Sequence, residues 1–226
     1  MNVECLLRDS MKTKPKSNRG ARQKTSTPKN VTRMNYNENP YGMSDAVKKA
    51  VTDASLNSYM YQDFYAVDLK KQLADLYGLT VDHVCIGAGS SAIIDMLGEV
   101  FINYGDEVVY CAPTYEAFPD MVSDNGGVRV VLPLTDDYCY DLDAMLAAIT
   151  DRTKMVIVCN PNNPTSSCIT STDMRRILDA CKEYDIYVMV DETYVEFAEN
   201  MEEIDSVPLT NYYNNIVILR GTSKFF

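Results

Sequence analysis

Apolar runs alternate with amphipathic stretches along most of the chain after residue 80. The clearest run covers residues 186–190, where five apolar residues bounded by polar sequence predict a strand buried on both faces. Comparable runs predict strands at residues 83–86, 107–111, 128–132, 154–159 and 216–220. Helical spacing predicts helices at about residues 93–101, 142–149 and 172–184. Strands that alternate with helices predict an α/β fold with a mostly parallel sheet flanked by helices.

The chain before residue 80 follows another pattern. Residues 35–42 are a cluster of turn formers that cannot build a regular element. Ser44 predicts the N-cap of a short helix that runs to about Ser55. Residues 68–77 place apolar side chains on one face of a second helix, which we expect Gly78 to end.

The composition is that of a globular protein. The chain has 226 residues, 46% of them apolar, and can bury a core as one large domain or two small ones. No apolar run approaches the roughly 18 residues that span a bilayer, and the amino terminus has no apolar segment of the signal-peptide type. Seven cysteines form an odd set without a C-x-x-C pair, which favours reduced thiols. These features predict a soluble, cytoplasmic protein with no membrane partner.

Charge divides the chain in two. Residues 1–33 carry nine Lys or Arg against two acids, a net charge of +7, while residues 34–226 carry twelve against thirty, a net charge of −18. The acidic body repels nucleic acid, so we expect no nucleic-acid partner. The basic arm at residues 1–33 is most simply a disordered tail, with a targeting presequence or an RNA-contacting arm as the alternatives.

His83 is the single histidine of the chain. Its isolation argues against an H-E-x-x-H metal site and against a zinc centre with several histidines. Ser-His-Asp hydrolysis would need His83 itself as the base. We expect His83 to lie in a short turn that leads into a strand, and we expect no metal.

Polar residues of several kinds follow the predicted strands. In a parallel sheet the carboxyl ends of the strands share one edge, where α/β proteins bind their ligands. The loops at this edge carry Gly89, Ser90, Ser91, Tyr115, Asn163, Asp191, Tyr194, Ser223 and Lys224. A buried carboxylate without a partner costs several kcal/mol, so Asp191 is expected to face a cation or to accept many hydrogen bonds.

This set of groups matches one cofactor. The glycine-serine loop at a helix start favours a phosphate, and Tyr115 can stack on a planar ring. Lys224 can form a Schiff base with an aldehyde, while Asp191 can pair with a pyridinium nitrogen. Each signal alone is weak, because a G-x-G-S loop is often only a tight turn and a single lysine is often only a solvated charge. Their shared placement at strand ends points to pyridoxal 5′-phosphate.

Six motifs in chain order resemble those of the fold type I, class I/II aminotransferases. They are Asn37-Glu38-Asn39-Pro40-Tyr41-Gly42, Gly87-x-Gly89-Ser90, Pro113-Thr114-Tyr115, Asn160-Pro161-Asn162-Asn163-Pro164-Thr165, Asp191-Glu192-Thr193-Tyr194 and Thr222-Ser223-Lys224. The first motif most resembles the histidinol-phosphate aminotransferases, enzymes of amino-acid biosynthesis. The resemblance covers about residues 34–226.

The resemblance implies a role for each matching residue. Lys224 would form the Schiff base with the cofactor and shuttle a proton, and Asp191 would hold the ring nitrogen protonated. Asn163 and Tyr194 would hydrogen-bond the phenolic oxygen of the ring, and Tyr115 would stack on its face. The phosphate would be held by Gly89, Ser90, Ser91 and Ser223, together with Tyr61 from the partner subunit of a homodimer. Asn39 and Tyr41 would contact the substrate.

The resemblance also implies a domain division and a reaction. Residues 1–33 would be the arm, residues 34–57 the N-terminal segment of a small domain, and residues 58–226 a truncated cofactor-binding large domain. The reaction would move an amino group between an L-amino acid, or histidinol phosphate, and a 2-oxo acid.

Several departures from the family pattern leave alternatives open. Ser91-Ala92 stand where the family has an acidic pair, Ser166 replaces a glycine, and Gly221 replaces a residue that often offers a hydroxyl. The sequence stops two residues after Lys224, before the family's phosphate-binding and carboxylate-binding arginines. Weak or no transamination is expected from residues 1–226 alone. The alternatives are an amino-acid-phosphate decarboxylase that binds the same cofactor, and a non-catalytic remnant or interaction module.

Overall fold

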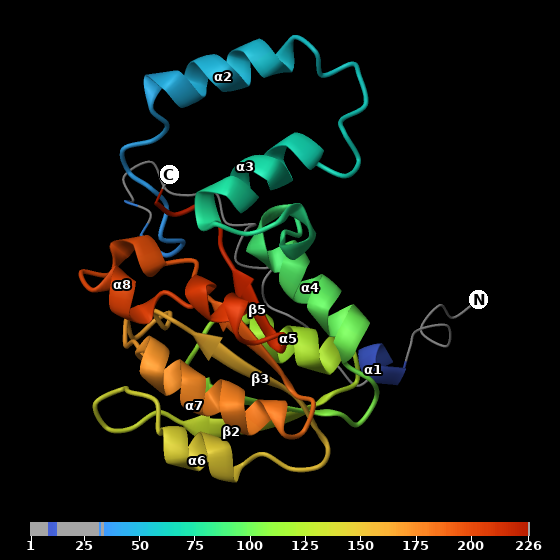
Figure 1. The fold of residues 1–226 in the computed structure, drawn as a ribbon, viewed down its shortest axis with the longest axis vertical. Coiled ribbons are helices and arrows are strands. Elements are labelled where there is room, and N and C mark those ends of the chain that lie inside the picture. Colours follow the sequence, from blue (N-terminus) through green and yellow to red (C-terminus); the bar gives the residue numbers. More distant parts are fainter. Residues whose placement is uncertain (1–8, 13–31, 33, 226) are drawn as a thin grey trace.

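The computed structural model describes residues 9–12, 32 and 34–225 (Figure 1). Its centre is a five-stranded sheet with the order β2-β1-β3-β4-β5, in which every neighbouring pair is parallel. The strands are β1 (Glu107–Ala112), β2 (Val128–Pro133), β3 (Thr153–Cys159), β4 (Tyr187–Asp191) and β5 (Ile216–Leu219). The predicted parallel α/β architecture is confirmed.

Helices cover both faces of this sheet (Figure 1). The first face packs against α6 (Leu142–Ala147) and α7 (Ser171–Lys182), which bury Met145, Ile177 and Leu178 against the valines of the strands. The second face packs against α4 (Gly89–Phe101) and α5 (Ala117–Asp124). Because side chains alternate along a strand, Val188 and Val190 of β4 face the first layer and Met189 faces the second.

The sequence pattern did not predict α5. Its Pro119 reads as a helix breaker, but it lies in the first turn, where the missing N–H would have no partner within the helix. Phe118, Met121 and Val122 of α5 are buried in the second layer. Burial of these side chains explains why the segment is helical.

The predicted strand at residues 83–86 is wrong. His83 ends a 3-10 helix, η2 (Val81–His83), and none of residues 84–86 belongs to a strand. A strand needs a hydrogen-bonded neighbour, and among the described strands β5 pairs only with β4, so this short apolar run has nothing to pair with. The turn predicted for His83 is confirmed, and its Nδ1 lies 2.8 Å from Thr80 Oγ1.

The helices α2 (Asp45–Ser55) and α3 (Val67–Tyr77) lie apart from the helices that cover the two faces of the sheet (Figure 1). Ser44 caps α2 as predicted, accepting a hydrogen bond from Val47 N, and Gly78 ends α3 in the left-handed region at φ +66°. The described part of α2 buries no residue, and α3 buries only Ala74.

The remaining elements are short. They are α1 (Asp9–Lys12), η3 (Val195–Phe197), α8 (Met201–Ile204) and η4 (Val207–Asn211). Apart from residues 9–12 and 32, the basic arm predicted at residues 1–33 lies outside the described residues. Among the described helices, none is long and apolar enough to cross a membrane. Residues 9–12, 32 and 34–225 contain no group of three or more His, Cys, Asp or Glu side chains that could hold a metal ion.

Candidate active site

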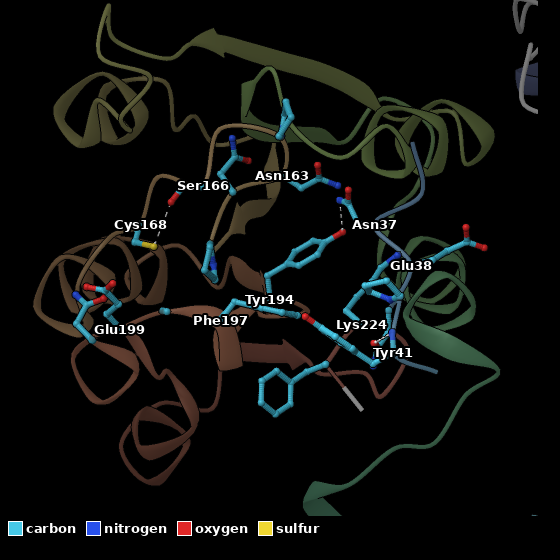
Figure 2. A pocket seen from close by; sticks show the side chains of 18 residues that line it. Asn37, Glu38, Tyr41, Asn163, Ser166, Cys168, Tyr194, Phe197, Glu199 and Lys224 are labelled. Carbon is cyan, nitrogen blue, oxygen red and sulfur yellow. Dashed lines mark hydrogen bonds between the residues drawn. The ribbon is translucent and has the colours of Figure 1, made fainter. Parts of the chain in front are cut away.

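The carboxyl ends of the strands β1, β3, β4 and β5 meet at one edge of the sheet. The register pairs Cys159 with Asp191, and Asp191 with Leu219, at this edge. Beside it lies a pocket of about 870 Å³ (Figure 2). Its lining includes Asn37, Asn39, Tyr41, Asn163, Ser166, Cys168, Tyr194 and Lys224.

Asp191 is the buried charge of the site. It is only 3% exposed, and its Oδ1 accepts hydrogen bonds from Thr193 N at 3.0 Å and Thr193 Oγ1 at 2.6 Å. Burial raises the pKa of the Asp191 carboxyl, and the two bonds from Thr193 offset only part of that rise. A carboxylate held at this depth is suited to pairing with a cationic ring nitrogen.

Tyr194 follows Asp191 by three residues and lines the pocket. Its Oη accepts a hydrogen bond from Asn37 Nδ2 at 3.0 Å, which Figure 2 draws as a dashed line. Burial raises the pKa of the Tyr194 phenol, the bond from Asn37 lowers it, and the charges of Asp191 and Tyr115 raise it further. Burial therefore favours the protonated Tyr194 phenol, which can donate a hydrogen bond as well as accept one.

Lys224 supplies the amine of the site. Its Nζ donates a hydrogen bond to the Tyr36 carbonyl at 2.7 Å, and its side chain lines the pocket together with Asn37 and Tyr194 (Figure 2). The segment of residues 36–41 therefore lies against both Lys224 and Tyr194.

The start of α4 offers a place for an anion. Gly89 has φ +79°, with nothing within 4 Å of the position that a Cβ would take. No side chain caps this 13-residue helix, so the first N–H groups have no side-chain acceptor. Ser91 Oγ lies 3.4 Å from Tyr115 Oη, and the Tyr115 ring packs edge-on against Phe118. N–H groups that no side chain caps, two serine hydroxyls and the helix dipole together favour a phosphate.

The family is decided by sequence comparison. The sequence model of the family "Aminotransferase class I and II" matches residues 29–226. The chain belongs to the class I and II aminotransferases. An aromatic amino acid aminotransferase of Rhodococcus jostii is 40% identical over 190 residues, which are 84% of this chain and 52% of that protein. This aminotransferase chain thus spans about half the length of the curated relatives it matches.

Solved structures of aminotransferases share the fold. The histidinol-phosphate aminotransferase of Sinorhizobium meliloti, solved in complex with pyridoxal 5′-phosphate, aligns with a TM-score of 0.74 and 26% identity. The alignment covers 84% of this chain and 51% of that one. A histidinol-phosphate aminotransferase-like protein of Erwinia carotovora aligns with a TM-score of 0.78 and 26% identity, covering 84% of this chain and 56% of that one.

The structure of this aminotransferase brings five of the twelve predicted site residues to one pocket, namely Asn39, Tyr41, Asn163, Tyr194 and Lys224. Asp191 does not line the pocket and lies at the end of β4, three residues before Tyr194. Gly89, Ser90, Ser91, Tyr115 and Ser223 do not line the pocket either. Tyr61 is 92% exposed on the loop between α2 and α3, where it stacks on Phe64.

Sequence reasoning missed Asn162 as a functional residue. Its side chain is 2% exposed, and Nδ2 donates to the Pro113 carbonyl at 3.0 Å and to Thr165 Oγ1 at 2.8 Å. Its Oδ1 accepts from Thr114 Oγ1 at 2.8 Å. Asn162 therefore ties the loop that carries Tyr115 to the loop that carries Asn163. The motif at residues 160–165 contained this residue but gave no sign of its bridging contacts.

Proposed function

We propose that this chain is the cofactor-binding part of an aminotransferase that uses pyridoxal 5′-phosphate to move an amino group between an L-amino acid and a 2-oxo acid. One observation carries the proposal. A 3%-exposed carboxylate, Asp191, lies at a strand end beside a pocket that is lined by the Lys224 amine. A buried carboxylate and a lysine amine at one edge of the sheet are the pair of groups that a pyridine aldehyde requires.

The surrounding groups fit the rest of the cofactor. The uncapped start of α4, with Ser90 and Ser91, suits the phosphate, and we assign Gly89 and Ser223 to the same subsite. Tyr115 places an aromatic ring beside this subsite, since its Oη lies 3.4 Å from Ser91 Oγ, and we assign it to stacking on the cofactor ring. The donor set therefore matches phosphate, ring and ring nitrogen.

When bound, pyridoxal 5′-phosphate supplies an aldehyde and an electron-withdrawing ring. Lys224 Nζ would be the amine that binds the aldehyde carbon and that moves the substrate's proton. Asp191 would keep the ring nitrogen protonated, and its burial would strengthen that ion pair. Tyr194 Oη and Asn163 Nδ2 would donate to the phenolic oxygen.

We propose an aromatic amino acid as the amino donor, with histidinol phosphate as the second candidate. The 40% identity to an enzyme named for aromatic amino acids supports the first, and the fold match at 26% identity to histidinol-phosphate aminotransferases supports the second. Asn39 and Tyr41 line the pocket, and we assign them to substrate contact.

The exposed apolar side chains around residue 61 support a homodimer. Tyr59, Tyr61, Phe64 and Tyr65 are between 76% and 92% exposed on one loop, a density of apolar surface that monomers rarely leave uncovered. We propose that a second copy covers this loop and that Tyr61 reaches the phosphate of the neighbouring copy.

The cysteines support a reducing, cytoplasmic compartment. Cys111, Cys159 and Cys181 are buried free thiols, and burial raises the pKa of Cys111 to about 11 and of the other two to about 12. Thiols in this state are inert, which suits a compartment without disulfide formation.

The experiment is a product assay on the gene's full reading frame and on residues 1–226. Protein loaded with pyridoxal 5′-phosphate is given L-phenylalanine, L-tyrosine or histidinol phosphate, with 2-oxoglutarate as acceptor. Formation of the matching 2-oxo product supports transamination. Release of carbon dioxide from a phosphorylated amino acid indicates the decarboxylase instead, and no product from either protein contradicts the proposal.

A further inference from the structure

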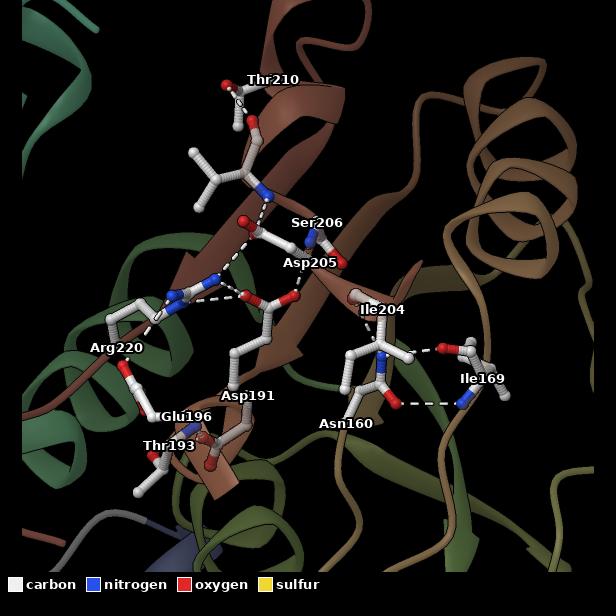
Figure 3. Close-up of polar contacts among 12 residues, drawn as sticks. Asn160, Ile169, Asp191, Thr193, Glu196, Ile204, Asp205, Ser206, Thr210 and Arg220 are labelled. Carbon is white, nitrogen blue, oxygen red and sulfur yellow. Dashed lines mark hydrogen bonds and ion pairs between the residues drawn. The ribbon is translucent and has the colours of Figure 1, made fainter. Parts of the chain in front are cut away.

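Arg220 lies at the centre of an ion cluster near the carboxyl end of β4 (Figure 3). Asp191 and Glu192 are consecutive, so their side chains leave the end of β4 toward opposite faces. Asp191 pairs in register with Leu219 of β5, whose side chain packs in the layer formed by α4 and α5. Glu192 points away from that layer, toward Arg220, which also contacts Asp205.

The contacts of Arg220 fix its guanidinium in one orientation. Glu192 Oε2 accepts from Arg220 Nε at 2.9 Å and from Nη2 at 2.6 Å, while Asp205 Oδ1 accepts from Nη2 at 2.7 Å. Glu192 is 0% exposed, and its Oε1 accepts from Ser206 N at 2.8 Å. Glu196 and the ring of Tyr77 complete the surroundings of Arg220. Two hydrogen bonds to one carboxylate are directional, unlike a point charge.

The cluster acts where the sheet's hydrogen bonding stops. The Glu192 N–H donates to the Leu219 carbonyl at 3.0 Å, and β5 ends at this residue. The next residue is Arg220, and Lys224 follows four positions later. The ion pairs of Arg220 therefore extend the connection between β4 and β5 by one residue beyond the strand pairing.

Stability alone gives little reason for such a cluster. A buried ion pair is often no more stabilising than an apolar pair of similar size, because both charges lose their hydration. Three carboxylates surround one guanidinium here, which makes the arrangement costlier still. Directional hydrogen bonds do give a fixed geometry. In the sequence, Asp191 directly precedes Glu192, and Lys224 follows Arg220 by four residues.

We propose that Arg220, held by Glu192 and Asp205, is a positioning residue that fixes the start of the residue 221–224 loop against the end of β4 and so sets Lys224 relative to Asp191. The effect on Lys224 and Asp191 rests on the proposed function, whereas the fixed start of the loop is independent of it.

The test compares three variants of the purified protein. Arg220→Met removes the guanidinium but keeps an apolar stem, and Arg220→Lys keeps the charge without the two-point contact. Leu178→Ala is the matched control, because Leu178 is 0% exposed on α7 and packs in the apolar core of that layer. Two readouts are taken: amide hydrogen exchange without cofactor, and the rate at which borohydride fixes pyridoxal 5′-phosphate on Lys224.

We expect Arg220→Met to accelerate exchange selectively at Glu192, at Ser206 and in residues 219–225. We also expect it to slow the fixation on Lys224 by roughly 10-fold or more, with Arg220→Lys intermediate. Leu178→Ala should lower Tm without either selective effect. Equal effects of Arg220→Met and Leu178→Ala, at equal loss of Tm, would overturn the proposal.

The two readouts separate the two claims. If the unmodified protein leaves no cofactor on Lys224, the proposed function fails. The exchange data still decide the positioning claim in that case, since a uniform change, or no change, in Arg220→Met contradicts it.

Discussion

The buried Asp191 carboxylate makes the stability of the cofactor-free protein depend on pH. Burial is the largest influence on its pKa and raises it above the ordinary value of 3.8. The folded state therefore binds this proton more tightly than the unfolded state does. The contribution of the Asp191 carboxyl to the stability of the folded state is most favourable below about pH 4 and is lost as the pH rises through its pKa in the folded protein.

Asp191→Asn removes the free-energy cost of burying an ionised carboxylate while keeping the local contacts. An asparagine Oδ1 can still accept both hydrogen bonds from Thr193. An incompletely compensated buried polar group costs roughly 1–3 kcal/mol, and the bonds from Thr193 offset part of this. We expect a gain of about 1–2 kcal/mol at pH 8, which for a domain of this size raises Tm by roughly 2–8 °C.

The assay is thermal unfolding followed by circular dichroism at several pH values up to 8, without cofactor. The control is Asp136→Asn, which removes the same charge from an exposed position. The gain of Asp191→Asn should grow as the pH rises from about 4, whereas Asp136→Asn should change little. An Asp191→Asn protein that is no more stable than the unmodified one at pH 8, or whose gain is the same at every pH, would refute the reasoning.

Three further changes test other parts of the account. Tyr194→Phe should remove the hydrogen bond that we propose to the cofactor, worth about 1 kcal/mol, so kcat should fall roughly 5- to 10-fold while Tm stays unchanged; a fall in Tm with normal kcat would contradict the role. Asn162→Ala breaks the link between two loops and leaves buried partners unpaired, so urea unfolding should show a loss of about 2–3 kcal/mol, and a loss below about 0.5 kcal/mol contradicts the bridge. Ser44→Ala removes the cap of α2, so exchange of the Val47 amide should rise while Tm stays constant, since α2 buries no residue; an equal fall in Tm contradicts this independence.

The sequence predicted the parts of the fold that depend on local pattern. Four apolar runs between residues 107 and 191, together with the run at residues 216–220, became the five parallel strands within one or two residues at each end. The sharing of one edge by parallel strands then brought Asn163, Tyr194 and Lys224 to one pocket, although they are up to 61 residues apart.

The sequence pattern could not predict side-chain contacts that depend on tertiary packing. The bridge of Asn162 to Pro113 spans 49 residues, and the pairing of Arg220 with Glu192 spans 28. Neither leaves a periodic signal, because each depends on which face of a strand a side chain leaves and on what the neighbouring loop presents. The error at residues 83–86 has the same origin, since an apolar run becomes a strand only when a neighbour is available to pair with it.

The most direct test of the central claim is to locate the cofactor on the chain. Purified protein is titrated with pyridoxal 5′-phosphate, reduced with borohydride and mapped by peptide mass spectrometry, with Lys224→Ala as the control. We predict a visible absorption band that disappears on reduction and a single tag on Lys224. Neither should be found in Lys224→Ala. Tags scattered over exposed lysines, with the same pattern in Lys224→Ala, would contradict it.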